Sequence, residues 1–236
     1  MGLRDLGKLA QLMRQLGKRP VYSIGAPQLE LVTVENRSMK ALVVIGHPAP
    51  CSLNHALAAE IASTWRSLGC EVAYHDLATE AFDPRLTAGE ARGNPTEDSL
   101  VQTYISELRA SDLLAIIHPN CWGAPPAIMK GWIDRVFAPN AAYTFAKGAD
   151  AGEEPIGLLR TRAALVINTG NTPAAREQSV FGDPLERIWR DCVLRYCGVR
   201  HVIRALFGVV ATSTPDERGR WLAEVRSLAT QAYELA

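Results

Sequence analysis

The chain of 236 residues is 47% hydrophobic, so it can bury a sizeable core and fits one domain plus additions. Its 25 Lys and Arg residues balance its 25 Asp and Glu residues, so no basic excess indicates a nucleic-acid partner and no acidic excess indicates docking to a basic partner. No apolar stretch approaches the roughly 18 residues of a membrane span, so we expect no membrane association, and five scattered cysteines without a disulfide pattern favour a cytoplasmic protein.

Residues 1–38 differ in character from the rest of the chain. Within residues 1–20, leucines fall on one helical stripe, and a single acid, Asp5, stands against several basic residues: Arg4, Lys8, Arg14, Lys18 and Arg19. Such a helix could lie on a membrane or on a partner, but it lacks the long apolar region of a secretory signal. We favour an extension outside the core fold, with the folded domain spanning residues 39–236.

From residue 39 onward, short β-branched runs alternate with amphipathic stretches. The pattern predicts strands near 40–46, 70–76, 113–118, 163–168 and 201–210. It predicts helices near 53–68, 97–110, 126–137, 184–196 and 215–235, the last with Thr214 as N-cap and Pro215 at its first position. This alternation indicates an α/β fold, a doubly wound five-stranded parallel sheet in a three-layer α/β/α sandwich.

Ligands of such folds bind beyond the carboxyl ends of the strands, where the strand order reverses. Three candidate loops follow strands directly, at 47–54, 119–126 and 168–172. Two longer insertions, 77–96 and 138–160, are rich in Gly, Pro, Asp and Ala, and long loops of this kind are usually lids, binding loops or interface segments.

The first loop has the features of a phosphate site. It runs from His47 through two prolines to Ser52, Leu53 and Asn54, where a helical pattern begins. Backbone N–H groups and a helix dipole would therefore point at one place. The side chains of His47, Ser52 and Asn54 add further hydrogen-bond donors.

The second and third loops suit a flat ring. Trp122 provides an apolar wall in the stiff segment Pro119–Pro126, whose free N–H groups can bond a ring edge. In the third loop, Gly170 permits close backbone approach between Thr169 and Asn171. A tryptophan at a loop tip is costly to expose, so we expect Trp122 to contact a ligand or a second subunit.

With these residues in view, residues 39 to about 235 resemble the flavodoxin-like NAD(P)H:quinone oxidoreductase family, which includes DT-diaphorase and bacterial relatives. The loop from His47 to Asn54 matches the family's flavin-phosphate loop. The segment from Pro119 to Trp122, with the run Pro126–Phe137 after it, is similar to the isoalloxazine loop and its following helix. Asp83-Pro84 is similar to a further family pattern.

The resemblance implies a tightly bound flavin, FMN or FAD, and NAD(P)H as co-substrate. It implies that hydride passes from NAD(P)H to the flavin and onward to a quinone or similar small acceptor. It also implies a homodimer, with the substrate pocket at the subunit interface. The implied contacts to phosphate and ribityl are His47, Ser52, Leu53 and Asn54, and those to the ring are Pro119, Asn120, Cys121, Trp122, Gly123, Thr169, Gly170 and Asn171.

The chain departs from the family at the third loop. It carries Thr169-Gly170-Asn171 where many relatives have Thr-Gly-Gly, and residues 173–180 contain no Tyr. The Tyr and His that some animal members place near the flavin are therefore absent, so no proton relay carries over. Two other functions stay open: an electron-transfer flavodoxin, which the neutral charge disfavours, and a flavin-binding regulatory subunit of a membrane transport system.

Simpler readings apply to several other residues. His47, Cys51 and His55 are four apart, but Pro48 and Pro50 forbid a regular helix there, so we expect no metal site. We expect Trp132, Ile133, Val136 and Phe137 in the core, Asp134 and Arg135 as solvated or interface charges, and Cys192 and Cys197 as buried thiols. No P-loop and no Gly-x-Ser-x-Gly motif is present, which excludes a P-loop NTPase and an α/β-hydrolase.

Overall fold

The computed structural model describes residues 38–148 and 152–236, and a five-stranded parallel sheet lies at the centre of this part of the chain. Its strands are β1 (Lys40–Ile45), β2 (Glu71–Asp76), β3 (Leu113–Pro119), β6 (Ala163–Thr169) and β7 (His201–Phe207). The strand order β2-β1-β3-β6-β7 reverses between β1 and β3, which is the order of the flavodoxin-like fold. The predicted fold class is confirmed, whereas the predicted extension over 1–38 lies, but for Ser38, outside the described residues.

Side-chain alternation explains why the central strands are apolar over most of their length. In β1, Leu42 and Val44 join the core on one face of the sheet, while Ala41, Val43 and Ile45 join the core on the other. Successive residues of a strand point to opposite faces, so a strand covered on both sides needs apolar residues at every position. β3 and β6 follow the same rule and are buried along their length.

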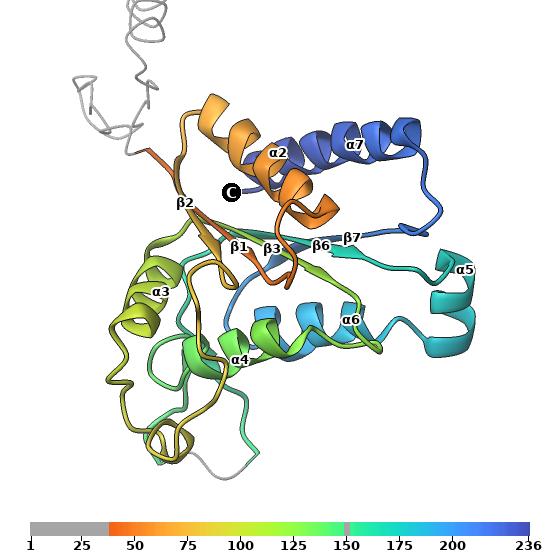
Figure 1. Cartoon of the computed structure of the whole chain (residues 1–236). Coiled ribbons are helices and arrows are strands. Elements are labelled where there is room, and N and C mark those ends of the chain that lie inside the picture. The colour runs from red at the N-terminus through yellow and green to blue at the C-terminus, as the bar shows by residue number, and fades with distance from the viewer. Residues whose placement is uncertain (1–37, 149–151) are drawn as a thin grey trace, which may run out of the picture. The chain divides into compact units, whose positions relative to one another are not determined.

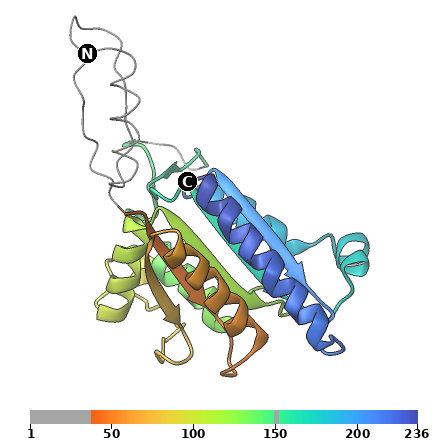
Figure 2. The same cartoon turned by 90° about the horizontal axis from the view of Figure 1, so that it is seen from above.

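Helices cover both faces, as Figure 1 shows. On one face, α2 (Leu53–Ser67) and α7 (Pro215–Glu234) lie side by side (Figure 2). The indole Nε1 of Trp65 in α2 donates to the carbonyl of Ala229 in α7. On the other face lie α3 (Ser99–Ala110), α4 (Ala127–Val136) and α6 (Pro184–Arg187), which continues as the wider turns of η3 (Ile188–Arg195).

The start of α7 confirms its predicted cap. Thr214 Oγ1 accepts a hydrogen bond from the N–H of Glu217, and the Glu217 carboxylate bonds back to the N–H of Thr214. This reciprocal pair satisfies backbone donors that a helix start otherwise leaves open. β7 ends at Phe207, earlier than predicted, because the chain then turns so that Val210 N–H donates to the carbonyl of Gly170.

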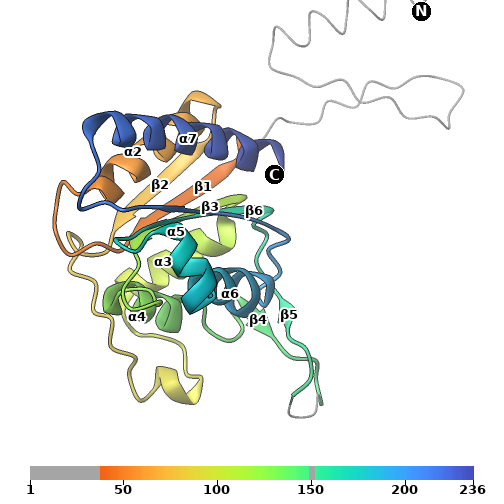
Figure 3. The ribbon, with the colours of Figure 1, turned by 90° about the vertical axis from the view of Figure 1, so that its right-hand side faces the viewer.

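Several short elements were not predicted. The two-residue strands β4 (Tyr143–Thr144) and β5 (Ile156–Gly157) pair in antiparallel fashion inside the 138–160 insertion, away from the central sheet (Figure 3). The turns η1 (Glu90–Arg92), α5 (Ala174–Arg176) and η2 (Glu177–Phe181) are similarly short. None has enough residues to show a period in the sequence.

The prediction that Arg135, in α4, is a solvated or interface charge is wrong. Its guanidinium is buried, donates to both carboxylate oxygens of Glu90 and to the carbonyl of Asp83, and forms an ion pair with Asp98. Burial by itself raises the pKa of Glu90, but hydrogen bonds from Arg135 and two threonines hold it down to about 2. Arg135 therefore fastens the 77–98 segment to α4.

The other core predictions have a mixed outcome. Trp132, Val136 and Phe137 are buried and Ile133 packs against the same core, as predicted. Cys197 is buried, but Cys192 is exposed, which contradicts its prediction. Among the described residues, no helix combines the length and the apolar character that crossing a membrane would take.

Candidate functional site

The three predicted loops meet at the carboxyl edge of the sheet. Asn54, in the first turn of α2, donates from Nδ2 to Oγ1 of Thr169, the last residue of β6, over 3.0 Å. Asn120, directly after β3, donates its backbone N–H to the carbonyl of Thr169 over 2.7 Å. Because β1, β3 and β6 are neighbours and parallel, the loops that follow them leave the sheet at one rim.

The first loop is braced from within. His47 Nδ1 lies 3.1 Å from the N–H of Ala49, which closes a tight turn directly after β1. His55 Nδ1 lies 2.7 Å from Ser52 Oγ and its Nε2 lies 3.0 Å from Asp76 at the end of β2. His55 thus occupies the position that Glu or Gln takes in a capping box, and it ties the helix start to the neighbouring strand.

The N-terminus of α2 keeps free donors. Within the described part of the chain, the backbone N–H groups of Leu53 and Asn54 find no hydrogen-bond acceptor. The first turn carries no acidic residue, and the partial positive charge of a fifteen-residue helix is concentrated at this end. This end of the helix can hold an anion such as a phosphate.

The second loop is a tight reversal with a strained tip. Cys121 and Ala124 exchange two backbone hydrogen bonds of 3.0 Å, while Trp122 and Gly123 between them adopt left-handed φ angles of 58° and 76°. Asn120 Oδ1 accepts from the N–H of Gly123 over 2.8 Å and so supports the turn from below. The Trp122 side chain is fully exposed in the isolated chain, and burial raises the pKa of the Cys121 thiol.

A cavity of about 440 Å³ lies between the second and third loops. It is lined by five of the predicted site residues: Asn120, Trp122, Gly123, Gly170 and Asn171. This volume falls in the range of small-molecule sites. The other predicted residues lie nearby but outside the lining: His47, Ser52, Leu53 and Asn54 on the first loop, Pro119 and Cys121 on the second, and Thr169 beneath the third.

The third wall of this cavity comes from a segment that sequence reasoning missed. Glu177, Phe181 and Pro184 line it from the 173–184 stretch, together with Thr172 and Leu206. Glycine at position 123 lets the 173–184 stretch pack closely against the second loop, because a β-carbon at that position would lie 2.8 Å from Cγ of Pro184. The residues of this stretch show no helical or strand period, so only their position in the fold identifies them.

A buried polar network supports the two ring loops from below. His118 Nε2 accepts from Asn168 Nδ2 and from Trp189 Nε1, at 3.0 and 2.7 Å. Arg204 donates to Asn168 Oδ1 and pairs with Asp183, which links β7 to the 173–184 segment. Burial and, to a lesser extent, the Arg204 charge lower the pKa of His118 to about 4, although the hydrogen bond to the Pro119 carbonyl raises it, so the imidazole is neutral near pH 7. His118 lies just before the second loop and Asn168 just before the third, so the hydrogen bond between them fixes the position of one loop relative to the other.

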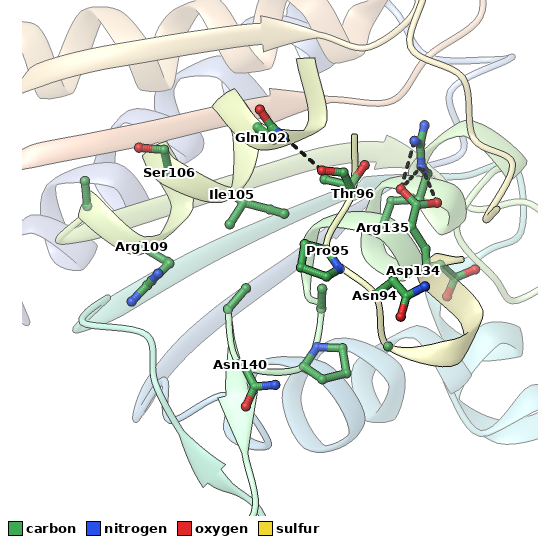
Figure 4. A pocket seen from close by; sticks show the side chains of 16 residues that line it. Asn94, Pro95, Thr96, Gln102, Ile105, Ser106, Arg109, Asp134, Arg135 and Asn140 are labelled. Atoms are coloured by element: carbon green, nitrogen blue, oxygen red, sulfur yellow. Dashed lines mark hydrogen bonds and ion pairs between the residues drawn. The ribbon is translucent and has the colours of Figure 1, made fainter. Parts of the chain in front are cut away.

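A second hollow, of about 680 Å³, lies on the α3–α4 face. The two long insertions contribute to it, with Asn94 and Pro95 from one and Asn140 from the other, opposite Ile105 and Arg109 of α3 (Figure 4). It shares no lining residue with the cavity at the strand ends. None of the three strand-end loops contributes to this hollow, so the smaller cavity is the candidate site.

The chain belongs to the flavodoxin-like fold family, whose model matches residues 39–228. NAD(P)H dehydrogenase (quinone) 1 of Rattus norvegicus is 27% identical over 201 residues, which cover 76% of this chain and 72% of the relative. The solved structure of an NAD(P)H:quinone oxidoreductase from Methanothermobacter marburgensis has a TM-score of 0.70 at 22% identity, over 81% of this chain and 98% of that one. An FMN-dependent NADH-azoreductase from Bacillus anthracis, solved with FMN, has a TM-score of 0.64 at 13% identity, over 82% and 98%. The family model and the Rattus norvegicus relative confirm the predicted family resemblance, and the two solved structures share the fold.

Proposed function

We propose that the chain is a flavin-dependent NAD(P)H oxidoreductase that passes hydride from NAD(P)H through a bound flavin, FMN or FAD, to a quinone or a similar small acceptor. The observation that carries this proposal is the meeting of the three loops on Thr169, with a cavity between Trp122 and Gly170. The kinship with NAD(P)H dehydrogenase (quinone) 1 supports the reaction class. The FMN complex among proteins of this fold supports the cofactor.

The donors of the first loop fit a flavin phosphate. The free N–H groups of Leu53 and Asn54, the Ser52 hydroxyl and the His47 imidazole would hold it at the start of α2. A phosphate placed there meets hydrogen-bond donors and the positive end of the helix dipole without any Lys or Arg. These donors would allow a loop without Lys or Arg to bind a charged group.

The second and third loops fit the isoalloxazine ring. Gly123, Gly170 and Asn171 would offer backbone to its polar edge, and the indole of Trp122 would cover apolar area. Pro119, Asn120, Cys121 and Thr169 would shape the floor beneath. The flavin supplies two-electron chemistry when bound; these residues orient it and exclude water on one side, which is what hydride transfer between stacked rings needs from a protein.

A homodimer is part of the proposal. Trp122 and Phe181, which line the cavity, are exposed aromatic side chains in the isolated chain. Exposed aromatic groups near a cavity are typical of a surface that another chain covers. Sedimentation of the full chain should give twice the monomer mass, and a monomer that turns over fully would remove this part of the proposal.

The test of the proposed function is made on the purified full chain. Extraction and mass measurement of the chromophore should identify FMN or FAD, and NADH or NADPH should be oxidised steadily only when benzoquinone is present. Protein that stays colourless after incubation with excess FMN and FAD would refute the proposal. Bound flavin without NAD(P)H oxidation would point instead to the carrier or the regulatory subunit.

A further inference from the structure

Glu177 is the one titratable side chain among the residues that line the cavity at the strand ends. The rest of that lining consists of glycines, amides, a threonine and apolar residues. The Glu177 residue is only 3% exposed, and its Oε1 accepts a hydrogen bond of 3.0 Å from Asn120 Nδ2. Its Oε2 makes no hydrogen bond to the described part of the chain, which leaves that oxygen available to a molecule in the cavity.

No cation compensates this carboxyl group. Within the described residues Glu177 has no ion pair, and the neighbouring Arg176 lies over the Phe181 ring at 5.5 Å instead. Burying a carboxyl group without a cationic partner costs stability. The hydrogen bond from Asn120 does not require a carboxyl group at position 177, because the side-chain carbonyl of a glutamine would accept it equally well. A purely structural role therefore does not explain why the residue is an acid.

The chemistry of a quinone acceptor can explain why an acid lies in the wall of this cavity. Reduction of a quinone to a hydroquinone takes up two electrons and two protons. A hydride brings both electrons and one proton, so the second oxygen of the acceptor needs one more proton from an acid. An acid placed beside the reacting molecule contributes typically 10²–10⁴-fold to such a step.

We propose that the carboxyl group of Glu177 donates this second proton. The O–H bond of the carboxyl group breaks as a new O–H bond forms on the acceptor, the hydride supplies the electron pair, and the resulting carboxylate takes a proton from water before the next turnover. This proposal rests on the proposed function. It predicts that the site favours acceptors that must gain a proton, such as quinones, over acceptors that take electrons only, such as ferricyanide.

The experiment compares Glu177→Gln with wild type and with Asp191→Asn, which removes an exposed carboxylate on η3 that pairs with Arg195. Flavin affinity, anaerobic reduction of the bound flavin by NAD(P)H, and turnover with benzoquinone and with ferricyanide are measured for each. Glu177→Gln should bind flavin and be reduced as wild type, keep ferricyanide turnover within about twofold, and lose quinone turnover by about 100-fold. Asp191→Asn should match wild type in all four measurements.

The alternatives give different results. Unchanged quinone turnover in Glu177→Gln would overturn the proposal. An equal loss of turnover with both acceptors, or a weaker affinity for flavin, would also overturn it, since either result would show that the carboxyl group positions the Asn120 loop. Wild-type protein that binds no flavin would refute the proposed function itself, before the variant is made.

Discussion

Trp122→Ala tests ligand binding with little effect on the folding of a single subunit. The indole is fully exposed in the isolated chain and contributes nothing to the core. Alanine keeps the β-carbon, so the left-handed φ of 58° is equally strained in both proteins. We expect the free energy of unfolding of the flavin-free protein to change by less than about 0.5 kcal/mol.

The effect on flavin affinity follows from the area that a bound ring would cover. A tryptophan buries about 150–250 Å² when fully enclosed, and a ring stacked on one face covers roughly half of this, about 100 Å². At about 25 cal/mol per Å², this contact is worth about 2.5 kcal/mol. The dissociation constant should therefore rise about 50-fold, since about 1.4 kcal/mol corresponds to a factor of ten.

Two measurements test this reasoning. Titration of flavin-free protein with FMN and with FAD, followed by flavin fluorescence, gives the dissociation constant, and urea unfolding gives the stability. Trp132→Ala is the matched control: that indole is buried in the core, so its loss should cost about 3–5 kcal/mol of unfolding free energy. A dissociation constant within threefold of wild type for Trp122→Ala would show that the indole does not cover the ligand.

Three further predictions concern the packing and buried polar groups of the fold. Gly123→Ala should cost more stability than Gly69→Ala, because both glycines have positive φ but only the first would place a β-carbon 2.8 Å from Pro184, whereas Gly69 faces open space; equal urea midpoints would argue against that contact. Burial lowers the pKa of His118 from 6.5 to about 4, so the unfolded chain binds a proton before the folded chain does. Unfolding free energy should therefore fall by about 3 kcal/mol as pH drops from 6.5 to 4, and His118→Gln should lack this loss. Arg135→Ala leaves a buried carboxylate unpaired and should cost about 3–5 kcal/mol in urea unfolding, and a loss under 1 kcal/mol would mean that the ion pair is solvated.

The strands and long helices were predictable because burial imposes a period on them. Most positions of β1, β3 and β6 are apolar because helices cover both faces of the sheet, and Thr214 and Pro215 mark the start of α7. Such signals depend on neighbours in the chain alone. The prediction of the sheet and of its class therefore needed no knowledge of distant contacts.

Arg135 shows where this reasoning fails. An arginine after Asp134 in a helix has the pattern of a surface charge, and nothing in its neighbourhood indicates that Glu90 and Asp98 fold over it. The error for Cys192 is of the same kind, since η3 turns that residue outward. Burial of a single side chain is set by what packs on it, often from far away in the sequence.

The sequence by itself determined the α/β class, the order of the elements and the three loops that could hold a flavin, because hydrophobic period and turn residues act locally. The tertiary structure decided the rest. It joined Asn54 to Thr169 across 115 positions, enclosed a cavity between Trp122 and Gly170, and brought Glu177 into its wall. Those contacts exist only after the sheet aligns its strand ends, since the distance between such residues depends on strand order and packing, which no local pattern encodes.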